Sequence, residues 1–430
     1  MDSTERRPFQ YRRMKFFFPD SQDLVDPHFD FHDETHPEFR VRQRDDVYAH
    51  EVFDTPPFDG LLVSKAIVDG AGASSGKYTI AQRHRLLRLG IHEFLRCDNH
   101  LGKSPLQIMG DCGAFTYKDE NTPPFTVDEV ITFYEMLGFD LGISVDHVIL
   151  GFNEEWDLSL PGFDPVPEQF RDRQELTLSL ASEFLALAED QDVAFTPVGV
   201  AQGWSPKSYA RAVNELQAMG YTYIALGGLV PLKTPEILAT LYAVDEERTA
   251  STRLHLLGVT RVSEFKRFSE LGVVSFDSTS PFLQAFKDAK NNYHTLDGAY
   301  SAIRVPQVEG SPKLRRLIRS GKVNQEEAKR LERLCLDNLR SYAREGASIE
   351  SVIQGLEEYE ELHSSSVKRI PRYRQTLEAR PWDQCSCDVC REIGVEVVMF
   401  RGSERNKRRG FHNLHVFRQR VSVQAALLSN

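Results

Sequence analysis

The sequence predicts an α/β fold, a (β/α)8 barrel of the TIM type with a helical insertion and a small C-terminal zinc-binding subdomain. Between about residues 60 and 280, short apolar runs alternate with longer amphipathic segments. This alternation is typical of parallel strands joined by helical crossovers, and the number of units, near eight once the ends are included, favours a closed barrel. Polar residues and glycines follow the apolar runs, where barrel enzymes keep their chemistry: Asp111-Cys112-Gly113, Asp146, Gln202-Gly203, Gly227-Gly228 and Asp277.

The individual elements follow from the spacing of the apolar residues. Strands are expected within residues 60–68, 105–113, 143–150, 194–203, 222–229, 254–259 and 273–279. Helices are expected at 80–95, 127–139, 167–190, 206–219, 233–246 and 262–271. The segment 311–380 differs because it shows no strand pattern, and its apolar residues keep to one helical face: Leu331, Leu334, Cys335, Leu339 and Tyr342.

Four parts of the chain are therefore expected. Residues 1–13 form an N-terminal extension that we expect to be disordered, and residues 14–310 form the catalytic barrel. Residues 311–380 form the helical insertion, and residues 381–430 contain the zinc-binding subdomain and the elements that close the fold.

Composition indicates an ordinary globular protein of the cytoplasm. Of its 430 residues, 41% are hydrophobic and 27% are charged, and no apolar stretch approaches the roughly 18 residues that span a bilayer. The N-terminus lacks the apolar core of a secretory signal. Three of the 6 cysteines lie close together, which favours a metal site in a reducing compartment over a disulfide framework.

The formal net charge of -11 argues against a protein that binds nucleic acid electrostatically over most of its surface. Basic residues are nevertheless concentrated in three places in the last third of the chain. They are Lys313, Arg315, Arg316, Arg319 and Lys322; Lys368, Arg369, Arg372 and Arg374; and the Lys and Arg residues within 401–420. Each cluster is either a solvated face or a contact surface for nucleic acid.

The motif near the C-terminus has the spacing of a zinc site. Cys385, Cys387 and Cys390 offer three thiolates as C-x-C-x2-C, and FHNLHVF follows with two histidines. Three sulfurs and one imidazole make a closed tetrahedral set, which is typical of a structural zinc. His412 is the preferred fourth ligand, and His415 is the alternative.

Two aspartates at predicted strand ends have the residue type that glycosyl transfer needs. Asp277 is placed to attack an anomeric carbon and form a covalent glycosyl intermediate. Asp111 is placed as a general acid and base that protonates the departing base and deprotonates the incoming one. Taken singly, each aspartate could instead cap a helix or a turn.

On these motifs the sequence resembles the tRNA-guanine transglycosylases, and most closely the bacterial branch of that family that acts on DNA. The resemblance runs from about residue 60 to 300 and resumes at 385–417. It rests on GDCGAF, DLGISVD, GVAQG, ALGGL, LLGV and FDS in the barrel, and on CSCDVC with HNL near the C-terminus.

The resemblance implies a role for each matched residue. Asp277 is the nucleophile, Asp111 is the acid/base residue, and the base lies between Phe115 and Leu257. Asp146 reads the Watson–Crick edge of the base. The other implied base-binding groups are Gln202 and the backbone amides of Gly227 and Gly228, and His412 completes the zinc site.

The resemblance further implies the exchange of guanine in DNA for 7-cyano-7-deazaguanine, a 7-deazaguanine, through a covalent aspartyl-glycosyl intermediate. The implied partners are DNA, the free base and an ATPase of the same modification system. The chain departs from the family pattern at Cys112, Ala114 and Thr116, and it lacks the recognisable arginine stretch after the nucleophile. These departures, together with the insertion at 311–380, favour DNA over tRNA as the acceptor.

Three other functions compete with this one. The first is the same base exchange on tRNA, because nothing in the barrel motifs separates ribose from deoxyribose. The second is a metal-dependent barrel hydrolase, which needs an open metal site with His-x-His after an early strand, and the sequence lacks that motif. The third, a catalytically dead nucleic-acid-binding scaffold, is disfavoured because both Asp111 and Asp277 are present.

Overall fold

The computed structural model describes residues 13–72, 74–98, 105–157, 166–362 and 369–429. Residues 1–12 of the predicted extension, and Lys368 of the second basic cluster, lie outside these ranges. The chain packs into two compact units. The first unit contains residues 58–279 with both chain ends, and the second contains residues 23–57 and 280–420. The four-part division expected from the sequence stays a proposal.

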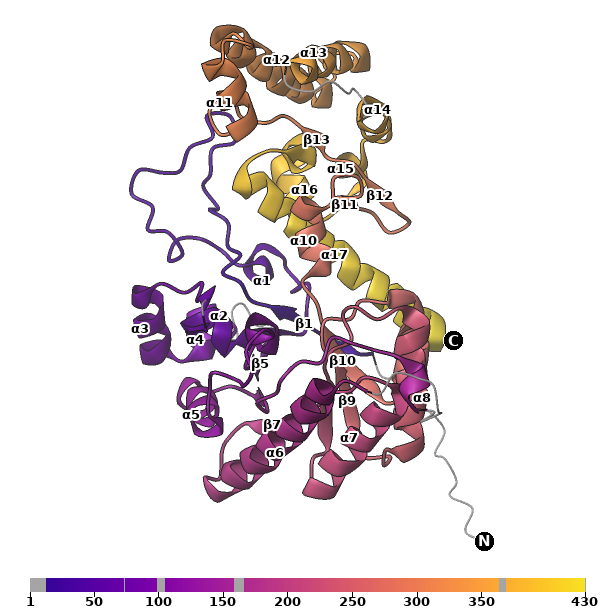
Figure 1. The fold of residues 1–430 in the computed structure, drawn as a ribbon. Coiled ribbons are helices and arrows are strands. Elements are labelled where there is room, and N and C mark those ends of the chain that lie inside the picture. Colours follow the sequence, from indigo (N-terminus) through magenta and orange to yellow (C-terminus); the bar gives the residue numbers. More distant parts are fainter. Residues whose placement is uncertain (1–12, 73, 99–104, 158–165, 363–368, 430) are drawn as a thin grey trace. The chain divides into compact units, whose positions relative to one another are not determined.

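Eight parallel strands close into a barrel in the first unit, which confirms the predicted fold class (Figure 1). In barrel order they are β1 (Lys15–Pro19), β10 (Val273–Asp277), β9 (Arg253–Leu256), β8 (Tyr223–Leu226), β7 (Thr196–Ala201), β6 (Leu141–Ile143), β5 (Gln107–Asp111) and β2 (Gly60–Ser64). The barrel closes through β1, where Phe17 pairs with Asp277 on one side and with Gly60 on the other.

Helices follow the strands as the alternation predicted. They are α2 (Lys65–Asp69), α3 (Ile80–Leu89), α4 (Ile91–Leu95), α5 (Val127–Leu137), α6 (Glu168–Asp190), α7 (Pro206–Met219), α8 (Thr234–Glu247) and α9 (Phe265–Glu270). The side chains of Thr79, Thr126 and Ser205 cap the first turns of α3, α5 and α7 by accepting backbone N–H bonds. Figure 1 shows α6, α7 and α8 along the outside of the barrel.

Two predicted elements have different bounds in the structure. The strand expected at 60–68 ends at Ser64. Its last residues instead form the short helix α2, which buries the apolar side chains of Ala66 and Val68. The helix expected at 80–95 breaks at Gly90, whose φ of 76° lies in a region that a residue with a side chain rarely adopts. In both segments the apolar residues were predicted correctly, but the local backbone geometry decided where each element ends.

Inward-facing side chains of the strands fill the barrel. One core cluster contains Phe17, Leu62, Met109, Leu141, Ile143, Val198, Val200, Tyr223 and Ala225. These residues occupy alternate strand positions, because successive side chains of a strand point to opposite faces of a sheet. The lumen is therefore a packed core, and polar groups are available mainly at the carboxyl ends of the strands.

The second unit is mainly helical, including the segment for which the sequence predicted no strands. Its helices are α1 (Ala49–Val52), α10 (Ser280–Lys287), α11 (Pro312–Arg319), α12 (Gln325–Ala343), α13 (Ile349–Glu361), α14 (Ile370–Ala379), α15 (Pro381–Gln384), α16 (Asp388–Ile393) and α17 (Gly402–Ser429), the last of which ends in the first unit. Two small sheets join β11 (Tyr293–His294) to β12 (Ala299–Tyr300), and β13 (Ile303–Arg304) to β14 (Met399–Phe400).

The basic cluster at 401–420 is largely an interior feature, which corrects its interpretation as a solvated face or nucleic-acid surface. Arg405 and Arg409 are 1% and 0% exposed. Arg405 donates to Glu34 and Glu396 over 2.6 Å in each case, and Arg409 donates to the carbonyl of Ala285. Buried guanidinium groups need such partners, and two of these partners, Glu34 and Ala285, come from distant parts of the sequence.

None of the helices within the described ranges is long and apolar enough to cross a membrane.

Candidate active site

One pocket at the carboxyl ends of the barrel strands gathers every catalytic and base-binding residue that the sequence predicted. Its volume is about 410 Å³, within the range of small-molecule sites. The predicted residues that line it are Asp111, Phe115, Asp146, Gln202, Gly227, Gly228, Leu257 and Asp277. They come from segments far apart in the sequence and meet because the carboxyl ends of parallel barrel strands share one rim.

The strands fix where each functional side chain begins. Asp111 and Asp277 are the last residues of β5 and β10, and Gln202 follows β7 directly. The glycine pair 227–228 follows β8, and Leu257 follows β9. A site assembled from strand ends is held by the barrel hydrogen bonds rather than by loops alone.

Asp277 is held through one of its two carboxylate oxygens. Its Oδ1 accepts from the backbone N–H of Gly258 over 2.9 Å and lies 3.2 Å from Nε2 of His255. Oδ2 has no hydrogen-bond partner within the described ranges, and the residue is only 7% exposed. The pocket therefore presents a carboxylate with one anchored and one free oxygen.

Asp111 has the electrostatic character of a proton carrier. Burial raises the pKa of Asp111 to about 7, and the nearby charges of Asp146 and Asp277 raise it further while backbone N–H groups oppose them. A carboxyl group that titrates near neutrality can both release and accept a proton at physiological pH. Because the charge of Asp277 raises the pKa of Asp111, the two predicted catalytic carboxylates lie close enough to influence each other electrostatically.

Asp146 is the centre of a buried polar network. Its Oδ2 accepts from Nε2 of Gln202 over 2.7 Å, and its Oδ1 accepts from the Cys112 thiol over 3.2 Å. Tyr117 donates to the Cys112 sulfur and lies 3.1 Å from the backbone carbonyl of Asp146. Burial raises the pKa of Asp146 to about 6, against the effect of its hydrogen bonds. The network fixes a carboxylate and an amide side by side on the pocket wall.

Gly228 allows the backbone to approach this network closely. Its φ is 74°, and a Cβ atom there would lie 2.4 Å from the carbonyl of Ile149. The neighbouring carbonyl of Gly227 accepts a 2.7 Å hydrogen bond from the Tyr209 hydroxyl. Any side chain at 228 would push the backbone away from Gln202 and narrow the pocket.

Phe115 and Leu257 provide the apolar walls. Phe115 lies in the 3₁₀ helix η2 (Ala114–Tyr117) and is 56% exposed, which is unusual for an aromatic side chain beside a cavity. Leu257 is half-buried against the barrel core. An exposed ring and an aliphatic side chain on one pocket are suited to hold a planar base between them.

Sequence reasoning missed two polar residues of the site. His255 is fully buried beside Asp277, and Asp20, directly after β1, lines the pocket and accepts a 2.7 Å hydrogen bond from Tyr78. Both had a detectable signal. Strand alternation places residue 255 on the same face as Leu257, and Asp20 follows the apolar run FFFP as the other aspartates follow their strands.

The predicted zinc ligands meet in the second unit. The sulfur atoms of Cys385, Cys387 and Cys390 lie 3.5, 3.4 and 3.4 Å from Nδ1 of His412. A tetrahedral zinc with bonds of about 2.3 Å to sulfur and 2.0 Å to nitrogen would separate such ligands by about 3.5 Å, so the donor set fits zinc. His415 instead stacks on Phe53, with ring centroids 5.1 Å apart.

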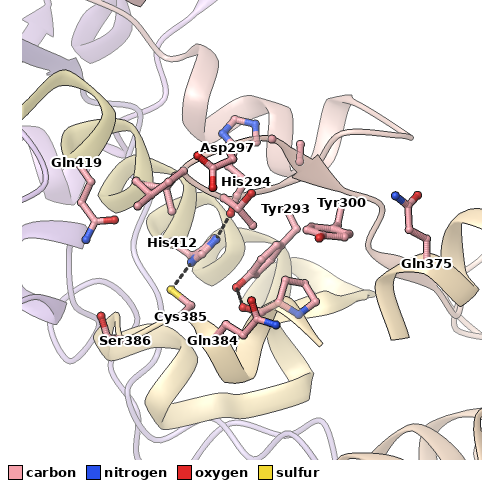
Figure 2. A pocket seen from close by; sticks show the side chains of 16 residues that line it. Tyr293, His294, Asp297, Tyr300, Gln375, Gln384, Cys385, Ser386, His412 and Gln419 are labelled. Atoms are coloured by element: carbon pink, nitrogen blue, oxygen red, sulfur yellow. Dashed lines mark hydrogen bonds between the residues drawn. The ribbon is translucent and has the colours of Figure 1, made fainter. Parts of the chain in front are cut away.

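The surroundings of His412 hold its ring in the orientation of a metal ligand. Its Nε2 lies 2.8 Å from the carbonyl of His294, which fixes Nε2 as the protonated nitrogen and leaves Nδ1 for the metal. Tyr293 stacks on the ring at a centroid distance of 4.1 Å. Figure 2 shows His412 between Cys385 and His294, with Tyr293 alongside, at the edge of a second cavity.

No protein-family model matches the chain. It is similar to a DNA-guanine transglycosylase of Salmonella montevideo, with 48% identity over 421 residues, which cover 97% of this chain and 99% of that protein. It is also similar to a tRNA-guanine(15) transglycosylase of Methanosarcina mazei, with 25% identity over 269 residues. That second match covers 58% of this chain and only 50% of the other protein.

Proposed function

This chain belongs to the DNA-guanine transglycosylase family, and we propose accordingly that it exchanges guanine in DNA for a 7-deazaguanine base. We take 7-cyano-7-deazaguanine as the incoming base. The observation that carries the proposal is the single pocket that holds Asp111 and Asp277 together with the base-binding groups. The near full-length likeness to the Salmonella protein supports DNA as the acceptor.

In the first half of the reaction, Asp277 is the nucleophile. Its free Oδ2 forms a bond to C1′ of the target deoxyguanosine, while the bond from C1′ to N9 of guanine breaks. Asp111 gives its proton to the departing base, so guanine leaves as a neutral molecule. The target nucleotide must first leave the base stack, because its anomeric carbon is otherwise shielded.

In the second half, the incoming base takes the place of guanine. Asp111, now a carboxylate, accepts the proton of N9, and N9 displaces Asp277 from C1′. Two displacements at the same carbon retain its configuration. The side chains of Asp146 and Gln202 and the backbone amides of Gly227 and Gly228 supply hydrogen-bond partners for the base edge, and Phe115 and Leu257 supply the two faces of the sandwich.

The metal centre has a structural role in this proposal. Cys385, Cys387, Cys390 and His412 would hold one zinc ion, which when bound supplies a cross-link of four ligands with no open position for chemistry. The ligands come from the segment around α16 and from α17, so the metal ties these two elements of the second unit together.

Helix α11 is the proposed contact for the DNA backbone. Lys313, Arg315, Arg316 and Arg319 are all exposed on it, while Leu314 is buried. Like Lys322 just beyond the helix, these four side chains form no ion pair within the described ranges. Unpaired exposed cations are the usual source of affinity for phosphates.

We further propose that the enzyme works in the cytoplasm with an ATPase partner of the same modification system.

A base-exchange assay tests the proposal. Labelled guanine should be incorporated into duplex DNA, and wild-type protein should form a covalent adduct with DNA that Asp277→Ala abolishes. Asp172→Ala, which alters an exposed aspartate of α6, is the matched control and should form the adduct normally. An adduct that persists in Asp277→Ala, or labelled guanine that enters tRNA and not DNA, would overturn the proposal.

A further inference from the structure

A chain of hydrogen bonds runs through the barrel interior from β8 to the proposed nucleophile. The Tyr223 hydroxyl contacts Oγ of Ser275, which lies 2.7 Å from Nδ1 of His255. Nε2 of the same imidazole lies 3.2 Å from Oδ1 of Asp277. His255 and Ser275 are both 0% exposed. Tyr223 itself belongs to the cluster of buried side chains in the lumen, so this chain of four polar groups runs through the barrel core.

The direction of these bonds follows from the donors available. Burial raises the pKa of Tyr223, so the phenol keeps its proton, and Ser275 is its hydrogen-bond partner within the described part of the chain. Since Oγ of Ser275 accepts that proton, its own hydroxyl proton points to Nδ1 of His255. Nδ1 is therefore the accepting nitrogen, and the proton of the imidazole resides on Nε2.

Nε2–H then donates to Oδ1 of Asp277, as the backbone N–H of Gly258 also does over 2.9 Å. Gly258 has a φ of 75°, a conformation that turns this N–H and that other residues rarely adopt. Two donors on Oδ1 fix the rotation of the carboxylate and leave Oδ2 as its free oxygen. Oδ1 can keep both bonds when it becomes the carbonyl oxygen of the covalent ester.

We propose that His255 is a positioning residue for Asp277, and that Ser275 and Tyr223 select the tautomer that it needs. This inference rests on the proposed function, in which Asp277 attacks the sugar. The competing explanation is a core histidine that merely fills space beside Phe17, whose ring centroid lies 6.0 Å away. The two explanations differ in the effect of isosteric amides at position 255.

Asparagine and glutamine separate the two explanations. The amide nitrogen of Gln extends to the position of Nε2 and can still donate to Asp277, whereas the amide of Asn extends only to the position of Nδ1. We expect His255→Asn to slow adduct formation about 100-fold, because the carboxylate loses its fixed orientation, and His255→Gln to stay within about 10-fold of wild type. His84→Asn, at an exposed histidine of α3, is the matched control and should react normally.

The readouts are single-turnover adduct formation on DNA and, separately, affinity for the free 7-deazaguanine base. Affinity for the base should be unchanged in His255→Asn and His255→Gln, since His255 does not line the pocket. If Asn and Gln slow the reaction equally, or if Asn slows it less than threefold, the positioning role is wrong. A wild-type protein that forms no adduct would instead overturn the proposed function, and the inference with it.

A measurement without substrate tests the tautomer. In protein labelled with ¹⁵N-histidine, the His255 signals, assigned as those absent from His255→Gln, should show Nε2 protonated and Nδ1 unprotonated. Ser275→Ala should alter this pattern, because Nδ1 loses its donor. A proton on Nδ1 in the wild-type protein would contradict the direction of the chain and overturn the proposal.

Discussion

Gln202 donates from Nε2 to Oδ2 of Asp146 over 2.7 Å, and both side chains are buried on the wall of the same pocket. The carbonyl oxygen of the same amide accepts from the backbone N–H of Ile149 over 3.2 Å. The orientation of the amide is thereby fixed by two partners of opposite polarity. This pair converts two separate strand ends into one rigid surface on the pocket wall, as the proposed recognition of a base edge requires.

Gln202→Ala should weaken use of the free base. It removes a donor to a buried carboxylate and leaves the N–H of Ile149 without its acceptor, a loss of about 1–3 kcal/mol, which corresponds to roughly 5- to 150-fold in kcat/KM for the base. Gln202→Glu should be worse, because it sets a second carboxylate against Asp146. Steady-state kinetics with varied base measure the effect. Gln191→Ala, at an exposed glutamine, serves as control, and equal kinetics of Gln202→Ala and wild type would remove Gln202 from recognition.

Adduct formation should depend on pH through Asp111. The first half-reaction needs the protonated form of this carboxyl, whose pKa is raised to about 7. In the absence of incoming base, the rate should therefore fall as the pH rises through about 7, and Asp111→Asn should be slower by about 100- to 10,000-fold. Rapid-quench measurements between pH 5.5 and about 8.5 follow this profile. The exposed Asp119→Asn is the control, and a rate in wild type that rises through the same range would contradict the role of Asp111 as the acid.

The same carboxyl groups should make stability depend on pH. The folded-state pKa values of Asp111 and Asp146 are raised to about 7 and about 6, above an ordinary value near 4. The folded chain therefore holds protons that the unfolded chain releases, so their contribution to stability is full below about pH 4 and declines as the pH rises to about 7. Asp111→Asn should raise Tm relative to wild type at about pH 8 and less at about pH 5. A lower Tm for Asp111→Asn than for wild type at about pH 8 would show that the fold stabilises the charged form of Asp111.

Loss of the metal should destabilise the second unit, because the proposed zinc is structural and takes no direct part in the chemistry. We expect one zinc ion per chain by elemental analysis, and its cobalt-substituted form should show the strong sulfur-to-metal absorption of a site with three thiolates. Cys390→Ser should lose the metal and lower Tm, since the ion joins α16 to α17. Cys335→Ser is a matched control for metal content, because that buried thiol lies outside the ligand cluster and donates to the carbonyl of Gly355. Full metal content in Cys390→Ser would disprove the ligand set.

Substitutions on α11 should reduce the salt dependence of DNA binding. If Arg315 and Arg316 each neutralise one phosphate, the double change to glutamine should lower the slope of log K against log salt by about 2. Fluorescence anisotropy with duplex DNA at several salt concentrations measures this slope. Arg88→Gln with Arg171→Gln removes two exposed arginines from the first unit and controls for net charge. Equal slopes for both double variants would show that α11 does not contact the backbone.

Much of the site was predictable because barrel topology turns sequence order into position. Once alternating strands and helices were recognised, Asp111, Gln202 and Asp277 were expected on one rim simply because each follows a strand. The cysteines of the candidate metal site were equally predictable, since three cysteines within one short segment leave little freedom of arrangement. Short-range spacing decided these features.

Other features depend on partners that sequence spacing cannot pair. The arginines near 401–409 had the composition of a nucleic-acid surface, yet Arg405 is buried against Glu34 and Glu396, the first of them more than 300 positions away along the chain. The sequence made His412 the preferred fourth ligand but left His415 as an alternative, and the packing of α17 places His412 at the cysteines. From the segment LHLLGV the sequence predicted Leu257 as a pocket residue, but it did not predict that His255 contacts Asp277.

The sequence by itself therefore determined the barrel, the residue types at its catalytic rim and the composition of the metal site, because these depend on periodicity and on neighbours within a few residues. Only the tertiary structure decided which oxygen of Asp277 is free, which charges are buried and how far the pKa of Asp111 rises. Those properties depend on burial and hydrogen bonding between segments that the chain brings together only when it folds.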